Sequence, residues 1–519
     1  MKTSFTILIL LTALATANAV VDANSAANLV YTDILEENIT GRSIMVLDRM
    51  VTEGSIVEAW NDEVTVPIDG YLVLIDDMAY ANWEHPCRWV FVGLNGEMEI
   101  IRMTSPPNEL ESMTVSHSCL PQIDGKGQYE DFINWFIPNV QSTSVNAGHM
   151  YALIISGGAS SGSNHIRYYG DVQFIYNVLA HDYLLQDDHI VVCFADGTNP
   201  APDQSGGLNS NPDFDDDGDT DINYDATSTG VSSGFSDITA MVGADDHLLI
   251  FTTDHGGPGK LSNSPPEVYL NLWSSQQLND DTYQTYLEGI VFESCHVVME
   301  QCYSGGFLGE SIAGTTGDPS SFASAANAYE SSWAGATYPE YDEYVYYWTG
   351  AMHGSTPPAT SVPGGALPGN PDVNGDGKVS FWEAFDRAKA WDTYAVSGQE
   401  HPQWDDDPDS CGDMYYLGGL ISTNIGDYEY SVSPSTGNLT ITGNPVSSVS
   451  TVMFNLGSPG VVEISVYDMS GHVVDNLLSD QLAAGHHSVN WSTGRLAAGV
   501  YIVRLKAGDV IESTRAVKF

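Results

Sequence analysis

A histidine and a cysteine each follow a short apolar stretch, and their side chains together could cleave a peptide bond. His255 follows the apolar residues 248–251, and Cys302 follows residues 297–299. A cysteine thiolate can attack a carbonyl carbon, and a neighbouring histidine can give a proton to the departing nitrogen. Glycines come soon after both residues, so main-chain N–H groups can approach the oxygen that gains charge. We therefore expect Cys302 as the nucleophile and His255 as its partner.

The apolar stretches before these two residues belong to a pattern that positions them. From about residue 150, apolar runs alternate with a segment of helical spacing at 168–185. The runs that predict buried parallel strands are 151–155, 190–194, 248–251 and 297–299. The alternation predicts an α/β domain with a mainly parallel sheet flanked by helices. Ligands bind at the carboxyl ends of such strands, so His255 and Cys302 should face one cleft.

Length and hydropathy predict several domains in an exported protein. The chain has 519 residues, which suggests about three domains. Residues 1–19 have the charged start, apolar core and small-residue cleavage site of a signal peptide. No later apolar run is long enough to span a bilayer. We expect a mostly β N-terminal domain at 25–145, the α/β domain at 148–425 and a β-sandwich at 433–519.

The charge balance limits the partners that this chain can have. It has 68 Asp and Glu against 16 Lys and Arg, for a formal net charge of -52. Such a surface is repelled by phosphate backbones and anionic lipids, which argues against nucleic-acid binding. The acidity fits either a solvated acidic surface or the binding of divalent cations.

The six cysteines include two that export would allow to pair. Cys87 and Cys119 lie in one region and could form a disulfide. Cys193 lies within an apolar run and is expected as a buried thiol. The chain has no CxxC motif, so nothing supports a zinc-ribbon or thioredoxin-like site.

The residues around the histidine and the cysteine resemble the motifs of a known peptidase family. The pattern Phe-Thr-Asp-His-Gly-x-Pro-Gly is matched, with one extra threonine, by Phe251, Thr253, Asp254, His255, Gly256, Pro258 and Gly259. The pattern Glu-Ala-Cys-Glu-Ser-Gly is matched at Glu300, Cys302, Ser304 and Gly305. Over about residues 150–348 the chain resembles the legumain (asparaginyl endopeptidase, C13) family of the caspase-like fold.

This resemblance implies a caspase/legumain-like fold and a cysteine endopeptidase that cleaves after Asn, or after Asp, through a thioester intermediate. Cys302 would attack the scissile carbonyl, and His255 would protonate the leaving nitrogen. The N–H groups of Gly256 and Cys302 would form the oxyanion hole. Substrates would be proteins or peptides, and the cysteine would need no catalytic metal.

The resemblance also implies a pocket for the substrate side chain. Its expected residues are Arg167, Ser331, Ser332, Asp342 and Tyr303, the last in place of a family glutamate. The guanidinium fork of Arg167 can hold an amide oxygen or a carboxylate. The alternative for Arg167 is a surface ion pair with Asp171. The third catalytic position of the family falls on His165 or on its neighbour Asn164.

Two Asp-rich loops have the spacing of calcium ligands, and we expect Ca²⁺ to be structural in both. The loop at 372–383 offers Asp372, Asn374, Asp376, the carbonyl of Lys378, Ser380 and Glu383. The loop at 213–225 offers Asp213, Asp215, Asp217, Asp219 and Asp221. Its twelfth position is Tyr224, with Asp225 one place late. The alternative for each loop is a plain acidic turn.

The last part of the chain resembles the C-terminal sorting domain of the type IX secretion route. The resemblance rests on Asn444-Pro445, Val466-Tyr467-Asp468, Gly471 and the run at 497–501. It implies contact with secretion machinery and delivery to the cell surface or the medium.

Two other functions remain open from the sequence. A transpeptidase on the same fold would pass the acyl group to an amine instead of water. A non-catalytic calcium-binding surface or adhesion protein would explain the acidity and the β modules. Peptide cleavage that depends on Cys302 would argue against the adhesion protein, whereas exclusion of water from the cleft, which the sequence does not show, decides between hydrolysis and transpeptidation.

Overall fold

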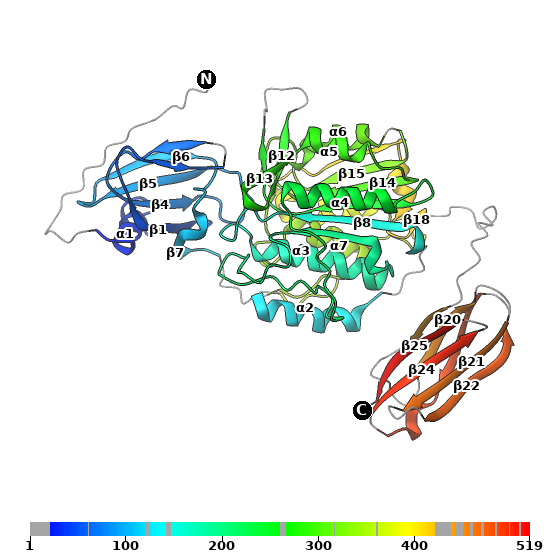
Figure 1. Ribbon diagram of the computed structural model, residues 1–519. Coiled ribbons are helices and arrows are strands. Elements are labelled where there is room, and N and C mark those ends of the chain that lie inside the picture. Colours follow the sequence, from blue (N-terminus) through cyan, green and yellow to red (C-terminus); the bar gives the residue numbers. More distant parts are fainter. Residues whose placement is uncertain are drawn as a thin grey trace. The chain divides into compact units, whose positions relative to one another are not determined.

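The chain divides into two units in the computed structural model, Met1–Thr423 and Asn424–Phe519 (Figure 1). The structure describes residues 21–519 except 61, 121–124, 142–146, 260–265, 316, 360–361, 421–436, 442–445, 447–449, 457–459, 469–471, 483–484, 498, 508–509 and 519. The predicted signal peptide, 1–19, therefore lies outside the described residues. Among the described residues, no helix has both the length and the apolar character needed to cross a bilayer.

The first unit begins with a helix, α1 (Ala23–Asp33), and a five-stranded antiparallel sheet of order β6-β5-β4-β1-β7. Its strands are β1 (Ser43–Val51), β4 (Gly70–Asp76), β5 (Cys87–Gly93), β6 (Met98–Met103) and β7 (Met113–Ser118). Because side chains alternate along a strand, Leu72 and Leu74 enter one core while Val73 and Ile75 pack with α1 in another. A short hairpin, β2 (Ile56–Glu58) with β3 (Glu63–Thr65), flanks this sheet.

A six-stranded sheet of order β16-β15-β14-β10-β8-β9 forms the centre of the first unit. Its strands are β8 (Met150–Ser156), β9 (Ile190–Phe194), β10 (His247–Thr252), β14 (Ser294–Met299), β15 (Ser320–Ser324) and β16 (Gln403–Asp407). Five of them are parallel, and the edge strand β16 is antiparallel. The predicted mainly parallel sheet is confirmed.

Helices cover both faces of this sheet (Figure 1). One face packs against α2 (Gly125–Asn139), α3 (Ile166–Asn177), α7 (Glu343–His353) and α8 (Phe381–Trp391). The other packs against α4 (Ser228–Met241), α5 (Asp280–Leu287) and α6 (Leu308–Gly314). Ile154 and Ile155 of β8 point to opposite faces and join the two cores. Phe132 and Phe136 of α2 also join the first core, so this helix packs with the central sheet, although 25–145 was expected to form one domain.

Small elements complete the first unit. They are β11 (Gly256–Pro258), β12 (Val268–Leu272), β13 (Gln276–Asn279), α9 (Thr393–Ser397), β17 (Tyr415–Tyr416) and β18 (Gly419–Leu420). The six cysteines are unpaired. The Cys87 thiol donates to the Ser105 carbonyl, so the suggested disulfide with Cys119 is wrong for this structure, whereas Cys193 is a buried thiol as predicted.

The second unit consists of two sheets. One has the order β19-β20-β23, and the other has the order β22-β21-β24-β25. The strands are β19 (Gly437–Ile441), β20 (Ser450–Leu456), β21 (Gly460–Asp468), β22 (Val473–Leu482), β23 (Gly485–Trp491), β24 (Gly499–Ala507) and β25 (Val510–Lys518). Val462, Ile464 and Val466 alternate into a core with Trp491, as expected for sandwich strands.

Candidate active site

Two neighbouring parallel strands deliver the histidine and the cysteine to the same edge of the central sheet. Thr252, the last residue of β10, pairs with Met299, the last residue of β14. His255 and Cys302 each come three residues later. Both side chains are fully buried, and what buries them comes from the N-terminal part of the chain.

The peptide bond between Asn82 and Trp83 lies against both of these side chains. The Cys302 thiol donates to the Asn82 carbonyl oxygen, with 3.0 Å between Sγ and O. The Trp83 N–H donates to Nδ1 of His255 at 3.0 Å. The sulfur and the imidazole thus contact the oxygen and the nitrogen of one peptide bond, the two atoms on either side of the carbon that a cysteine nucleophile would attack.

Hydrogen bonds fix the orientation of the His255 ring. Its Nε2 lies 2.8 Å from the Ser163 carbonyl oxygen, which can only accept, so Nε2 carries the proton. Nδ1 is then the acceptor for Trp83, and the Tyr168 hydroxyl lies 2.9 Å from the same atom. A main-chain carbonyl therefore holds the position expected for a third catalytic side chain.

Neither residue predicted for the third catalytic position hydrogen-bonds His255 through its side chain. The Asn164 side chain donates to the Asp203 carbonyl at 2.9 Å. The His165 ring packs edge-on, 5.4 Å from the His255 ring between centroids. His165 is the N-cap residue of α3, so the chain turns there, and this turn presents the preceding Ser163 carbonyl to the site.

Burial keeps the sulfur and the imidazole uncharged in this arrangement. It raises the pKa of the Cys302 thiol to about 12. It also lowers the pKa of His255 well below its usual value, with a smaller contribution from the Arg167 charge. Desolvation disfavours the charged form of each group. The pair therefore rests as thiol and neutral imidazole while the N-terminal segment covers it.

A fully buried pocket holds the side-chain amide of Asn82. Arg167 Nε donates to Asn82 Oδ1 at 2.9 Å, and the Tyr168 hydroxyl donates to the same oxygen at 2.7 Å. Asn82 Nδ2 donates to Ser332 Oγ at 3.0 Å and to Asp342 Oδ1 at 3.1 Å. Donors meet the amide oxygen and acceptors meet the amide nitrogen, so the pocket complements a carboxamide at both ends.

Charge balance inside the pocket comes from an ion pair. Arg167 Nε lies 3.0 Å from Asp342 Oδ1, and both side chains are buried. Burial raises the pKa of Asp342, and the Arg167 charge opposes this shift. The surface ion pair of Arg167 with Asp171 is not what forms, because Asp171 is buried and accepts from the Thr253 hydroxyl and the Asp342 N–H.

Three of the predicted residues make no contact with the Asn82 amide, and two of them bind the segment just beyond it. The Ser331 hydroxyl donates to the Glu84 carbonyl at 3.0 Å, beyond the peptide bond that Cys302 contacts. The Gly256 N–H donates to the Trp83 carbonyl at 3.1 Å, not to that of Asn82. Tyr303 has a left-handed backbone (φ 61°), and its N–H donates to Glu330.

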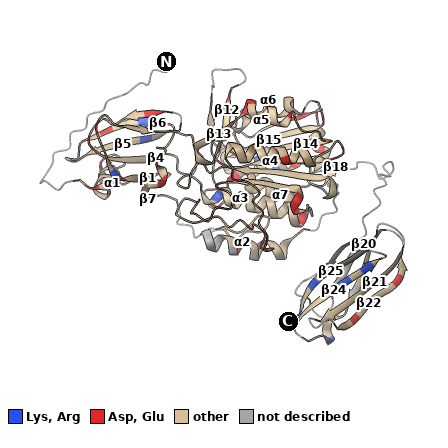
Figure 2. Ribbon diagram, in the orientation of Figure 1, with Lys and Arg blue, Asp and Glu red and all other residues tan. Residues whose placement is uncertain are grey.

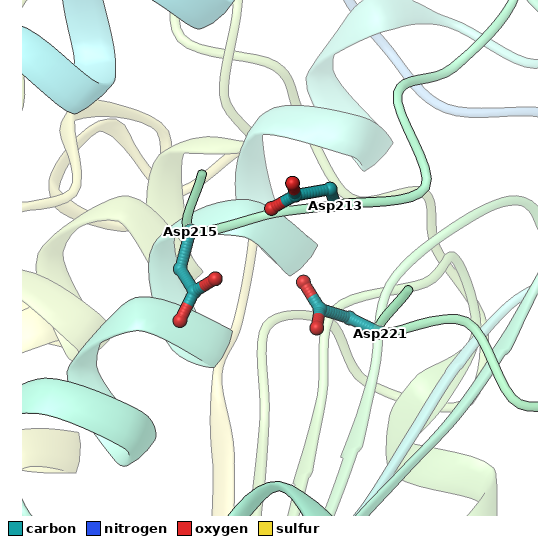
Figure 3. Close-up of side chains that lie close together, drawn as sticks. All are labelled: Asp213, Asp215 and Asp221. Carbon is teal, nitrogen blue, oxygen red and sulfur yellow. The ribbon is translucent and has the colours of Figure 1, made fainter. Parts of the chain in front are cut away.

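The loop at 213–225 brings carboxylates together. Oxygens of Asp213, Asp215 and Asp221 lie within 4.8 Å of one another (Figure 3). Asp221 also accepts from the Tyr176 hydroxyl of α3 at 2.9 Å. Asp217 and Asp219 are exposed and lie outside this group. Within the described residues, this is the one group of three such side chains whose geometry suits a metal ion.

The loop at 372–383 uses its last residues differently. The Ser380 hydroxyl accepts from the Glu383 N–H, and Glu383 accepts from the Ser380 N–H, which forms a capping box at the start of α8. The other Glu383 oxygen accepts from the N–H groups of Val373 and Asn374. Asp372 and Asp376 likewise accept main-chain N–H groups of their own loop. Calcium there stays a prediction.

Sequence reasoning missed three parts of this site. Asn82 lies on a loop of the N-terminal sheet, far from the motifs in sequence, and a lone Asn-Trp pair carries no signal. Tyr168 follows Arg167 directly, and its hydroxyl role could have been considered once Arg167 was placed at the start of a helix. The carbonyl of Ser163 acts through the main chain, which residue type does not reveal.

Comparison with known families agrees with this geometry. Residues 150–353 match the Peptidase C13 family, the family that the residues around His255 and Cys302 resemble. Residues 434–518 match a secretion system C-terminal sorting domain. The protein is therefore secreted or displayed at the cell surface.

Individual relatives are distant. The vacuolar-processing enzyme beta-isozyme of Arabidopsis thaliana is 27% identical over 175 residues, which is 30% of this chain and 34% of that enzyme. The chain thus spans about a third of that relative's length. A solved structure from Geobacter sulfurreducens aligns at 10% identity over 53% of this chain and 99% of its own, with a TM-score of 0.31. Dimeric latent PorU from Porphyromonas gingivalis aligns at 12% over 23% and 11%, with a TM-score of 0.14.

Proposed function

We propose that this protein is a secreted cysteine endopeptidase that cleaves peptide bonds after Asn through a thioester on Cys302. The observation that carries the proposal is the pocket around the Asn82 amide. Arg167 and Tyr168 meet its oxygen, and Ser332 and Asp342 meet its nitrogen. A pocket that satisfies every polar atom of one side chain rejects side chains that leave those groups unpaired.

The chemistry follows from the two contacts on the neighbouring peptide bond. The thiol proton of Cys302 passes to His255, and Sγ bonds to the carbonyl carbon of the Asn residue. His255 then gives a proton to the departing amine nitrogen, which lies on its Nδ1 side. Water hydrolyses the thioester, which restores the thiol and leaves a carboxylate on the Asn.

Activity on peptides with one variable residue tests this function. Purified protein is offered peptides that differ only in Asn, Asp, Gln, Arg or Lys before the scissile bond, with Cys302→Ala as the blank. We expect cleavage after Asn and none in the blank. Cleavage after Arg or Lys would contradict the pocket assignment. Addition of a free amine to the assay separates hydrolysis from transpeptidation, because a transpeptidase would accumulate the amide.

Calcium has a proposed structural role beside this site. Asp213, Asp215 and Asp221 present converging carboxylate oxygens, which is the donor type that Ca²⁺ prefers (Figure 3). Asp221 is tied through Tyr176 to α3, the helix that starts beside the pocket residue Arg167. Bound Ca²⁺ would hold this loop against α3, away from the reacting atoms.

A further inference from the structure

The segment at 80–84 is held in the groove by main-chain hydrogen bonds, with one antiparallel bridge at Ala81. The Ala334 N–H donates to the Tyr80 carbonyl at 2.7 Å, and the Asn82 N–H donates to the Ser332 carbonyl at 2.9 Å. Ala81 and Trp333 form an antiparallel bridge between these bonds. Adding a strand in this way supplies main-chain binding that is independent of side-chain identity, and alternate side-chain pockets supply specificity.

The same strand is held on the far side of the Asn82–Trp83 bond. The Glu84 N–H donates to the Gly256 carbonyl at 3.0 Å, and the Gly256 N–H donates to the Trp83 carbonyl. The Tyr269 hydroxyl donates to Glu84 Oε1 at 2.7 Å. Main-chain bonds on both sides therefore centre this one peptide bond on Cys302 and His255.

The segment is also anchored in the N-terminal sheet domain. The Trp83 ring is buried among the core residues of that domain and stacks on His85, with 4.0 Å between centroids. His85 Nε2 lies 2.8 Å from Asp76 at the end of β4. The N-terminal domain thus presents the segment rigidly to the groove.

We propose that the N-terminal domain keeps this enzyme latent through residues 80–84, and that the enzyme's own Cys302 cleaves the Asn82–Trp83 bond. The inference rests on the proposed function and adds a site of modification to it. In the step, the Cys302 thiol proton moves to His255 and Sγ bonds to the Asn82 carbonyl carbon. The bond to the Trp83 nitrogen breaks as that nitrogen takes the proton, and water then releases Asn82 as a carboxylate.

The register of the segment makes this cleavage slow. The Gly256 N–H is occupied by the Trp83 carbonyl at 3.1 Å, so it does not stabilise charge on the Asn82 oxygen. That oxygen lies instead 3.0 Å from Nδ1 of His85. The segment must shift before Gly256 can reach the developing oxyanion, and until it does the groove stays filled by an intact chain.

The first experiment follows self-cleavage of the full chain. Wild type, Cys302→Ala, Asn82→Gln and a control, Asn28→Gln, are incubated, separated on denaturing gels, and the new N-terminus is sequenced. Asn28 is exposed on α1. We expect a fragment that begins at Trp83 from wild type and from the control, and none from Cys302→Ala. Asn82→Gln should slow its appearance at least about tenfold, because one extra methylene displaces the carbonyl from Sγ.

The second experiment measures occlusion without relying on cleavage. Iodoacetamide labelling of Cys302 is timed by mass spectrometry in freshly purified wild type and in Asn82→Ala. The partly exposed Cys119 reports reagent activity in the same sample. Asn82→Ala loses the amide contacts that hold the segment, so Cys302 should label at least about tenfold faster. Equal labelling rates would overturn the occlusion.

A peptide assay separates failure of this inference from failure of the proposed function. Asn82→Ala, which cannot offer its own Asn at this site, is assayed on an Asn-containing peptide beside the double variant Asn82→Ala/Cys302→Ala. Activity of the single variant, combined with a wild-type chain that never yields the Trp83 fragment, would overturn self-cleavage alone. Equal activity of the single and double variants would overturn the function on which the inference rests.

Discussion

The groove at the edge of the central sheet and the N-terminal loop that fills it arise from different kinds of sequence feature. The groove arises where parallel strands end, and its residues sit in motifs that can be recognised along the chain. The loop joins two antiparallel strands of another domain and carries no motif. Yet its Asn82 is bound by four pocket side chains. The contrast shows that a binding site can be predicted locally, whereas the segment that occupies it depends on how domains pack.

The largest expected effect comes from removing the sulfur of the groove. Cys302→Ala should lower kcat/KM for Asn peptides by about 10⁴-fold or more, because nucleophile and base act as one unit. The measurement should be made together with Asn82→Ala so that occlusion does not mask it. Cys119→Ala is the matched control and should keep full activity. Substantial residual turnover in Cys302→Ala would show that the groove binds peptides but does not contain the reacting nucleophile.

The next effect comes from changing the guanidinium group that meets the amide oxygen. Arg167→Lys keeps the charge but loses the planar fork, so kcat/KM for Asn peptides should fall by about a hundredfold. The exposed Arg49→Lys, which pairs with Glu109, is the control and should change little. In the uncleaved chain, Arg167→Lys should also speed labelling of Cys302. If Arg167→Lys slowed peptide cleavage but left the labelling rate of Cys302 unchanged, the loop residue Asn82 and a substrate Asn would not occupy the pocket in the same way.

A smaller effect concerns how the free energy of unfolding depends on pH through a buried carboxyl group beside the groove. Burial raises the pKa of Asp254 to about 7, above its ordinary value of 3.8. The folded state therefore holds a proton between these values that the unfolded state releases, so this contribution to stability is present at low pH and is lost as the pH rises towards 7 and beyond. We expect the Tm to fall over this range, and Asp254→Asn to weaken the fall. Asp33→Asn, exposed on α1, should leave the pH dependence unchanged.

The smallest expected effect comes from removing calcium. At a free Ca²⁺ concentration of about 100 times Kd, binding would add about 2.7 kcal/mol to stability, so a chelator should lower the Tm by a few degrees. Asp221→Asn should remove most of this difference, whereas Asp216→Asn, outside the carboxylate group, should retain it. A chelator effect of the same size in both variants would point to the loop at 372–383 instead.

The central sheet and the meeting of His255 and Cys302 at its edge were predictable because both leave strong local patterns. Buried parallel strands are continuous apolar runs, and the residues after β10 and β14 had to meet at one edge. Arg167 was predicted for the pocket from its match to the family's pocket arginine, and Lys and Arg are sparse along the ribbon (Figure 2).

Other features depend on contacts that sequence does not encode locally. The carbonyl of Ser163 replaces the expected side chain of His165 or Asn164, since every residue has a carbonyl. Helix α2 packs on the central sheet although its residues follow the N-terminal strands directly. The two Asp-rich loops share a spacing, but Glu383 closes a capping box while Asp221 joins a carboxylate cluster. In each case the tertiary packing determines which of several possible partners makes the contact, and the sequence alone does not distinguish them.

The position of Asn82 between β4 and β5 has a consequence for what scission would leave behind. These strands pair along seven residues, from Gly70 with Gly93 to Asp76 with Cys87. A cut in the connecting loop breaks no part of that ladder, so the two pieces would stay associated through it without a covalent link. Inhibition would then change from a property of one molecule to an association equilibrium, and dilution would become a means of activation.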